Sequence, residues 1–186
     1  TGKLTPDIVR NVGARQVYFF RRDRIDSIRR QFMLAAPPAT GVEWRQSFLD
    51  FARSRNLTRS YKPVMLKALL KLVNRDGEAR LDDLAREFCQ YYIQRQNEGL
   101  AVEHGAPLLD DPANVSLDAI RQLILKNPLD RLLIQGFLEY SSEDGVVRFA
   151  PQLWQELRFY ELLDIQRGVE EQLRQYYSRS QFTGGV

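Results

Sequence analysis

The chain is poor in the two residues that most often build catalytic and metal sites. It has one cysteine, Cys89, and one histidine, His104, so no internal disulfide can form and a zinc site of ordinary composition would lack ligands. Cys89 lies among Phe88, Tyr91 and Tyr92, which predicts a buried structural thiol, whereas the polar loop around His104 predicts a solvated side chain. We therefore expect no metal and no cofactor.

Two further kinds of segment are missing. No apolar run approaches the length of a membrane span and no signal peptide is visible, so we expect a soluble, cytoplasmic protein without a membrane partner. The sequence has neither a Gly-x-x-x-x-Gly-Lys-Ser/Thr loop nor a Gly-x-Gly-x-x-Gly loop, which argues against ATP hydrolysis within this chain. Because the chain begins at Thr1 without an initiator methionine, we expect it to be a piece of a longer protein.

Positive and negative charges are unevenly divided along the 186 residues. Residues 1–60 hold 12 Lys and Arg against 5 Asp and Glu, a net charge of +7, whereas residues 61–186 hold 15 against 19, a net charge of −4. A basic segment beside a mildly acidic one indicates a polyanion as the partner of the first part, and nucleic acid is the commonest polyanion. Arginine with interleaved aromatic residues suits phosphate contact and base stacking.

The centre of the predicted fold is the segment 64–73, in which every residue except Lys67 and Lys71 is apolar. A helix that is apolar on nearly all sides belongs in the core of a domain. Ser60 is the expected N-cap of this helix, and Pro63 falls in its first turn, where a missing N–H costs little.

The remaining elements follow from hydrophobic period and turn residues. In chain order we expect an irregular lead-in (1–15), helices (about 16–34 and 42–55), the central helix, a strand (78–81), a helix (82–96), a loop (99–113), helices after Ser116 and over 129–135, a hairpin (137–140 with 146–149) and one long helix (151–177). Helix, strand, helix, helix, hairpin is the order of a winged helix.

We therefore predict a mainly α protein in three parts: an Arg-rich helical N-terminal lobe (1–57), a winged-helix-like core of helices and a two-stranded hairpin (58–150), and a long C-terminal helix with a frayed tail (151–186). The region 99–115 between the second and third helices is too long for a tight helix-turn-helix. That length argues against ordinary major-groove recognition.

Phe48-Leu-Asp-Phe-Ala-Arg53, followed by Leu57-Thr-Arg-Ser-Tyr-Lys-Pro-Val-Met-Leu-Lys-Ala-Leu-Leu70, resembles the region behind the motor in prokaryotic superfamily-two helicases of the DEAD/DEAH, restriction-subunit-like kind. Leu81-Asp-Asp-Leu-Ala-Arg-Glu-Phe88, Asn127-Pro128 and the hairpin 136–149 also look like their counterparts there, so the resemblance spans residues 20–155. It implies a C-terminal DNA-handling accessory domain of a helicase or of a restriction or phage-defence protein, with the ATPase outside this chain.

A weaker similarity is to the sulfur-binding domains of modification-dependent nucleases. In those domains a Lys-Pro start of a leucine-rich helix and a late hairpin frame a pocket for modified DNA. Tyr61, Lys62 and Pro63 are the matching positions here. The similarity implies a base or modified-phosphate pocket at Tyr61 and Pro63.

Clustered basic residues are the predicted contacts to DNA, duplex or single-stranded. They are Arg21, Arg22, Arg24, Arg29, Arg30, Arg53, Arg55, Arg59 and Lys62. If about six of them touch phosphates, the affinity should fall with salt with a log–log slope near −5. Such contacts position DNA without reading its sequence.

Two other interpretations of the basic and aromatic residues stay open. The arginines can instead form an internal electrostatic seam with acidic residues of the second half, such as Asp82, Asp83 or Glu87. The aromatic run 18–20, which precedes the arginines, can stack on bases, but such a run more often lies in a core.

The expected function is therefore that of a non-catalytic DNA-binding accessory domain. One alternative is a docking module for a partner protein or for another domain of the parent chain, with the C-terminal helix as the contact. Another is a small metal-dependent nuclease built on acid pairs such as Asp110-Asp111. Adjacent acids in a helix point in different directions, which argues against the nuclease.

Overall fold

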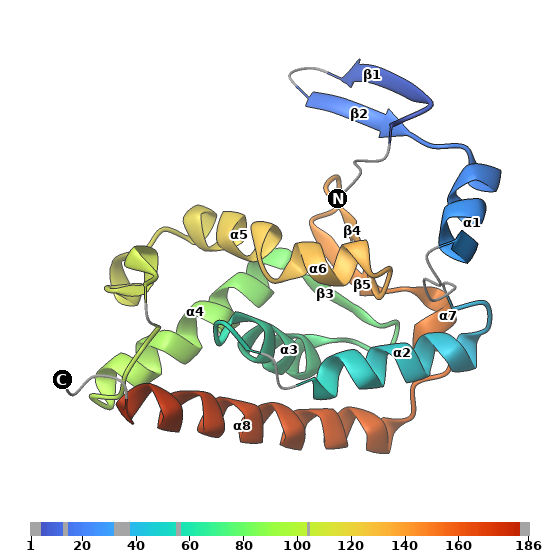
Figure 1. Cartoon of the computed structure of the whole chain (residues 1–186). Coiled ribbons are helices and arrows are strands. Elements are labelled where there is room, and N and C mark those ends of the chain that lie inside the picture. The colour runs from blue at the N-terminus through green and yellow to red at the C-terminus, as the bar shows by residue number, and fades with distance from the viewer. Residues whose placement is uncertain (1–4, 13–14, 32–37, 55–56, 104, 183–186) are drawn as a thin grey trace. The chain divides into compact units, whose positions relative to one another are not determined.

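The computed structural model describes residues 5–12, 15–31, 38–54, 57–103 and 105–182, which belong to two compact units (Figure 1). Unit 1 comprises residues 1–38 and unit 2 comprises residues 39–186. The boundary predicted after residue 57 instead lies inside unit 2. The reason is that Phe48, Leu49 and Ala52, on the helix before that boundary, are buried in the core of unit 2.

Unit 1 consists of a β-hairpin and a helix. Strand β1 (Ile8–Val12) pairs antiparallel with β2 (Arg15–Phe19), and helix α1 (Arg22–Gln31) follows. The predicted irregular lead-in and the predicted helix start near residue 16 are therefore wrong. Val17, Tyr18 and Phe19 are β-branched or aromatic, and such residues favour a strand. The helix starts only where Asp23 places a negative charge in its first turn.

Helix α3 (Tyr61–Leu72) is the centre of unit 2, which confirms the prediction of a buried central helix. Val64, Met65, Leu66 and Leu69 are at most 1% exposed. Helices α4 (Leu81–Asn97) and α8 (Phe159–Phe182) pack against α3, and α2 (Gly41–Arg53) packs against α8 (Figure 1). The central helix is thus enclosed by segments from both ends of the unit.

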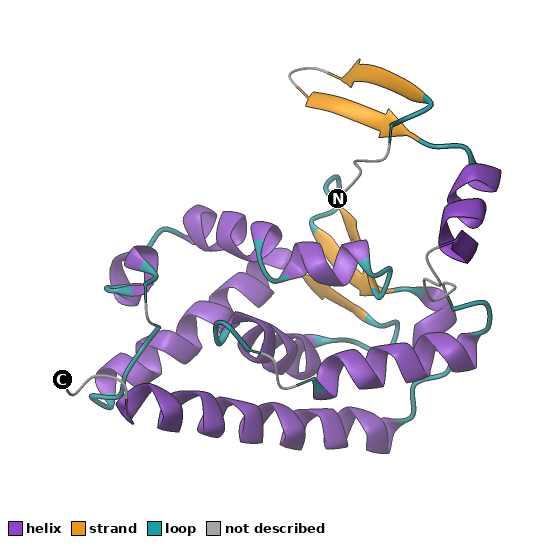
Figure 2. Ribbon diagram, viewed as in Figure 1, coloured by secondary structure: helices purple, strands orange, loops and turns teal. Residues whose placement is uncertain are grey.

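A three-stranded antiparallel sheet closes one side of this helical core (Figure 2). Its strand order is β3 (Glu78–Arg80), β5 (Val146–Phe149), β4 (Leu138–Ser141), so the predicted hairpin is confirmed and the predicted short strand pairs with its second strand. Phe48 of α2 makes edge contacts with Phe137 and Phe149, with ring centroids 5.4 Å apart in each pair. These contacts join α2 to the sheet.

Two short 3-10 turns and two helices connect α4 to the hairpin. The turns are η1 (Pro107–Leu109) and η2 (Pro112–Asn114), and the helices are α5 (Leu117–Lys126) and α6 (Leu129–Ile134). Ser116 caps α5 as predicted, because its Oγ accepts a hydrogen bond from the N–H of Ala119. Gly136 ends α6 at φ 74°, and the ring of Trp44 lies 2.8 Å from where a Cβ would be, so only glycine fits there.

The C-terminal region is two helices rather than the single helix predicted from Pro151. Helix α7 (Pro151–Trp154) ends after one turn, and the ring of Trp154 stacks on Phe149 of the sheet at 5.1 Å. Helix α8 then starts anew, where the carboxylate of Glu161 accepts a hydrogen bond from the N–H of Arg158. Within the described residues no helix is both long enough and apolar enough to span a bilayer.

Candidate nucleic-acid interface

Unit 1 carries most of the positive charge predicted for the DNA contact. Residues 1–38 hold 8 Lys and Arg against 3 Asp, a net charge of +5, whereas residues 39–186 have a net charge of −2. Asp7 accepts hydrogen bonds from the backbone N–H of Arg21 at 2.8 Å and from the side chain of Arg24 at 2.9 Å. These bonds lower the pKa of Asp7. One acid therefore orders two of the predicted arginines.

Exposed arginines lie at the start of α1 and directly before it. Arg21 and its ion-pair partner Asp23 are 73% and 69% exposed, and ion pairs this exposed contribute little to stability, so a phosphate can replace the aspartate. Arg22 is also exposed. The side chains of Arg29 and Arg30, which follow on α1, lie outside the described residues, as does the whole of Arg55.

The aromatic residues of β2 and the segment after it are exposed rather than buried in a core. Tyr18, Phe19 and Phe20 are 53%, 47% and 36% exposed. The prediction of a core position is therefore wrong for them. A two-stranded hairpin has too little sheet to bury aromatic rings on both of its faces.

Among the described residues, the three acids named for the predicted electrostatic seam have cationic partners in the second half of the chain. Asp82, Asp83 and Glu87 each bind a cation at 2.6 to 2.7 Å, and all three cations come from residues 61–186: Arg121, Arg86 and Lys71. Arg45 is different, because its Nε donates to the buried Glu161 at 2.9 Å. Arg45 therefore joins α2 to α8 and is not available to a ligand.

The predicted basic residues at the start of α3 meet at a cavity of about 350 Å³, which we call the Lys62 cavity. It lies between the end of α2, the start of α3 and the turn that joins α5 to α6. The cations Arg59, Lys62 and Arg131 line it together with the rings of Phe51 and Tyr61. No carboxylate is among the described residues of its lining. The cavity is therefore suited to an anion with an apolar part.

Lys62 supplies charge to this cavity rather than free hydrogen-bond donors. Its ammonium group donates to the carbonyl oxygens of Phe51 and Ser54, at 3.0 and 2.9 Å, and to the Ser54 hydroxyl at 2.8 Å. These acceptors use all three of its N–H groups. Lys62 thus satisfies carbonyl groups at the C-terminal end of α2, where a cation also interacts favourably with the helix dipole.

Arg59 and Tyr61 also line the Lys62 cavity. Arg59 donates to the Tyr61 hydroxyl at 3.2 Å and to the carbonyl oxygen of Gly105 at 3.0 Å. Burial raises the pKa of Tyr61. Pro63 is buried in the first turn of α3 and does not line the cavity. Arg53 and Arg131 are exposed near the cavity, at the end of α2 and on α6.

Lys62 is expected to make the stability of the protein depend on pH. Burial lowers its pKa to about 8, against 10.5 in an unfolded chain, so between these values unfolding takes up a proton. The free energy of unfolding therefore rises with pH over that interval. Lys62→Met, which removes the titrating group, is expected to flatten the rise in urea denaturation between about pH 7 and pH 10.5. Lys126→Met, at an exposed lysine, is the control and should keep the wild-type pH dependence. The prediction would be contradicted if the free energy of unfolding rose equally with pH in the wild type and in Lys62→Met.

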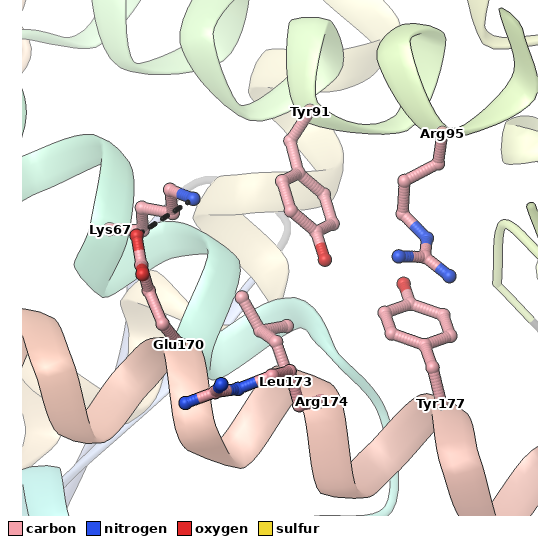
Figure 3. A pocket seen from close by; sticks show the side chains of 7 residues that line it. All are labelled: Lys67, Tyr91, Arg95, Glu170, Leu173, Arg174 and Tyr177. Carbon is pink, nitrogen blue, oxygen red and sulfur yellow. Dashed lines mark ion pairs between the residues drawn. The ribbon is translucent and has the colours of Figure 1, made fainter. Parts of the chain in front are cut away.

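A second hollow lies between α4 and α8, and sequence reasoning missed it. This Arg95 cleft, of about 310 Å³, is lined by Lys67 of α3, by Tyr91 and Arg95 of α4, and by Glu170, Leu173, Arg174 and Tyr177 of α8 (Figure 3). The only signal in the sequence is the stripe formed by Lys67 and Lys71 on the otherwise apolar helix. Nothing in the sequence places Arg95 on the ring of Tyr177.

A buried hydrogen-bond network at the start of α3 was also missed. Ser60 is the N-cap residue of α3, as predicted, but its side chain makes no cap bond to its own helix. Instead the buried carboxylate of Glu103 accepts hydrogen bonds from the Ser60 N–H at 2.9 Å and from the Ser60 hydroxyl. The Glu103 carboxylate thus caps α3 from a distant loop. Tyr92, Tyr176 and Tyr177 complete the network.

Cys89 and Asp111, which could in principle serve as a nucleophile or a metal ligand, make hydrogen bonds within the protein. The buried Cys89 donates to the carbonyl oxygen of Pro112 at 3.2 Å, and burial raises the pKa of its thiol, which confirms the prediction of a buried structural thiol. Asp111 accepts a hydrogen bond from Asn114 at 2.8 Å. Among the described residues, which exclude His104, no three His, Cys, Asp or Glu side chains are grouped so that they could hold a metal ion.

Comparison of the chain with protein-family models, curated proteins and solved structures finds no match. The resemblance to helicase accessory domains therefore stays a prediction. The charges, cavities and contacts of this chain are therefore the basis for its function.

Proposed function

We propose that this chain is a non-catalytic DNA-binding accessory domain of a helicase or of a restriction or phage-defence protein. The observation that carries the proposal is the Lys62 cavity, in which Arg59, Lys62 and Arg131 surround a concave site whose described lining has no carboxylate. Concave walls of low dielectric concentrate the field of like charges and attract an anion. The phosphate of a nucleic acid combines that charge with an aromatic base, which the rings of Phe51 and Tyr61 suit.

Unit 1 supports the same proposal independently. Its net charge of +5 within 38 residues is attractive to a polyanion, and its exposed Arg21 and Arg22 follow directly on the exposed Phe19 and Phe20. Arginine side chains bind phosphates, and aromatic rings stack on unpaired bases. Each unit thus offers arginine side chains and aromatic rings to a nucleic acid.

The topology of unit 2 is consistent with a winged helix. The order of elements α3, β3, α4, α5, α6, β4, β5 and the strand order β3-β5-β4 support this assignment, with α6 as an addition to the order expected for a winged helix. In it α5 corresponds to the helix that reads the major groove. Its Arg121, however, is bound to Asp82 and Asp118, and the turn of the hairpin carries Glu143 and Asp144. The acidic residues around α5 and in the hairpin turn repel DNA. They therefore favour phosphate contact by the arginines of unit 1 and of the Lys62 cavity over base reading by α5.

Within this proposal the Lys62 cavity is the base or modified-phosphate pocket that the weaker similarity implied. Tyr61 forms its aromatic wall beside Arg59. Pro63 is buried in the first turn of α3, where a missing N–H costs little, and does not line the cavity. Phosphate contacts would come from Arg59 and Arg131, because Lys62 has its donors engaged.

Fluorescence anisotropy with a labelled 20-base-pair duplex and the corresponding single strand tests the proposal. The wild-type protein is expected to bind at about 50 mM salt, and Arg131→Gln is expected to weaken binding and to reduce the log–log salt slope by about 1. Arg75→Gln changes the charge equally in the exposed turn after α3, so it should leave the slope unchanged. Absence of binding by the wild type to both DNAs would end the DNA interpretation.

A further inference from the structure

The Arg95 cleft has more positive than negative charge in its lining. Its lining residues include the cations Lys67, Arg95 and Arg174 and one carboxylate, that of Glu170, so the described lining has two positive charges in excess (Figure 3). Arg174 also binds Glu171 at 2.7 Å on the exposed side of α8, with 75% of the arginine side chain exposed. The cleft is therefore complementary to an acidic group.

Arg95 is held in place before any ligand arrives. Its Nε donates to the carbonyl oxygen of Ala101 at 2.7 Å, and its guanidinium carbon lies 3.4 Å from the centroid of the Tyr177 ring. A cation above the face of an aromatic ring is attracted by the ring quadrupole. Because the guanidinium is already oriented, a carboxylate that binds it costs less ordering entropy.

Glu170 shows how a carboxylate fits this cleft. Its Oε1 lies 3.3 Å from Nζ of Lys67, and the two side chains are 51% and 38% exposed (Figure 3). Ion pairs at this exposure contribute little to stability. A carboxylate from another molecule can therefore replace Glu170 at Lys67 at small cost.

We propose that the Arg95 cleft binds an acidic segment of a partner protein. One carboxylate of the segment replaces Glu170 at Lys67, and a neighbouring carboxylate binds Arg95. This site is separate from the Lys62 cavity and lies on the long C-terminal helix. The chain thereby joins a nucleic acid through one surface and an acidic protein through another.

The surroundings of the cleft favour a protein over a nucleic acid. Arg95 covers the face of Tyr177, and Lys67 lies 5.7 Å from the centroid of Tyr91, so both rings are occupied by cations and are closed to base stacking. A second cavity that Tyr177 also lines has Glu103 and Asp110 in its lining. A continuous run of phosphates would meet these acids, whereas a short acidic segment ends before them.

Anisotropy of a fluorescein-labelled decapeptide of alternating glutamate and serine tests this site in the full chain. Glu170→Gln removes the internal competitor and is expected to tighten binding about threefold, whereas Lys67→Gln is expected to weaken it by a similar factor. Glu143→Gln, in the exposed hairpin turn, changes the net charge equally and should leave the affinity unchanged. Arg22→Gln in unit 1 should also have no effect.

Three results would overturn the proposal. The first is equal peptide affinity for Glu170→Gln and Glu143→Gln. The second is a loss with Arg22→Gln as large as that with Lys67→Gln, which would place the peptide on unit 1. The third is a loss of single-stranded DNA affinity in Lys67→Gln as large as its loss of peptide affinity, which would assign the cleft to the nucleic acid. Glu170 is half exposed, so Glu170→Gln keeps the test decisive if Lys67→Gln folds poorly.

Discussion

Glu103→Gln is expected to lower the free energy of unfolding of unit 2 by about 3 kcal/mol, because it removes an acceptor on which a whole buried network depends. The Glu103 carboxylate accepts from the Ser60 N–H and hydroxyl and, at 2.5 Å, from the hydroxyl of Tyr176. An ionised carboxylate only accepts, so the Ser60 hydroxyl must donate to it. The Ser60 oxygen is then left to accept from Tyr92 at 2.8 Å and from Tyr177 at 3.1 Å.

Glutamine cannot take the place of this carboxylate. If its NH₂ group faced the Ser60 donors, a buried donor would lack an acceptor, which costs about 1 to 3 kcal/mol. If the NH₂ group faced Tyr176 instead, the Tyr176 hydroxyl would have to accept, and its own donation to this side chain would be lost. Its side chain also lacks the negative charge that the N-terminus of α3 favours.

Urea denaturation followed by circular dichroism measures the effect. Tyr176→Phe, which removes one donor of the network, is expected to cost about 1 kcal/mol. Glu139→Gln, on the exposed side of β4, serves as the matched control and should change little. If Glu103→Gln lost no more stability than this control, the network would have no role in holding α3, α4 and α8 together.

DNA affinity is expected to fall steeply with salt, with a log–log slope near −5 for about six phosphate contacts. Replacing Arg21, Arg22 and Arg24 together by glutamine is expected to reduce the magnitude of this slope by about 3, because each contact releases about one counterion. Affinity at about 50 mM salt should fall by two orders of magnitude or more.

The control for this triple variant replaces three exposed arginines of unit 2, Arg75, Arg158 and Arg167, which removes the same charge. Anisotropy over a salt series gives both slopes. Equal slopes for the two triple variants would mean that only net charge matters, and unit 1 would lose its assigned role. The hydrogen bonds of Arg24 to Asp7 and of Arg21 to Asp23 make a loss of local order an expected part of the effect.

The sequence predicts most of unit 2 because its signals are local. A run of apolar residues identifies α3, the Ser116 cap identifies α5, and the alternating residues on either side of a turn identify β4 and β5. In unit 1 the apolar residues from Val17 to Phe20 are too few to separate strand from helix, and the pairing with β1 decides for the strand.

The candidate sites are predicted less well because they depend on contacts between distant residues. Glu103 reaches Ser60 across 43 positions, and Arg95 stacks on a ring from another helix. The basic residues near α3 were found from composition, yet composition does not reveal that Lys62 has its donors committed to α2. Hydrophobic period reports which face of a helix is buried, but it does not report which polar groups meet inside.

Helix α8 runs beside the central helix and supplies Val169, Leu173 and Tyr177 to the core. A chain is synthesised from its N-terminus, so the side of α3 that packs against α8 stays uncovered until this last helix of unit 2 has left the exit tunnel. Closure of unit 2 is therefore delayed until its synthesis is nearly complete. A nascent chain paused before Tyr177 would present that surface to chaperones.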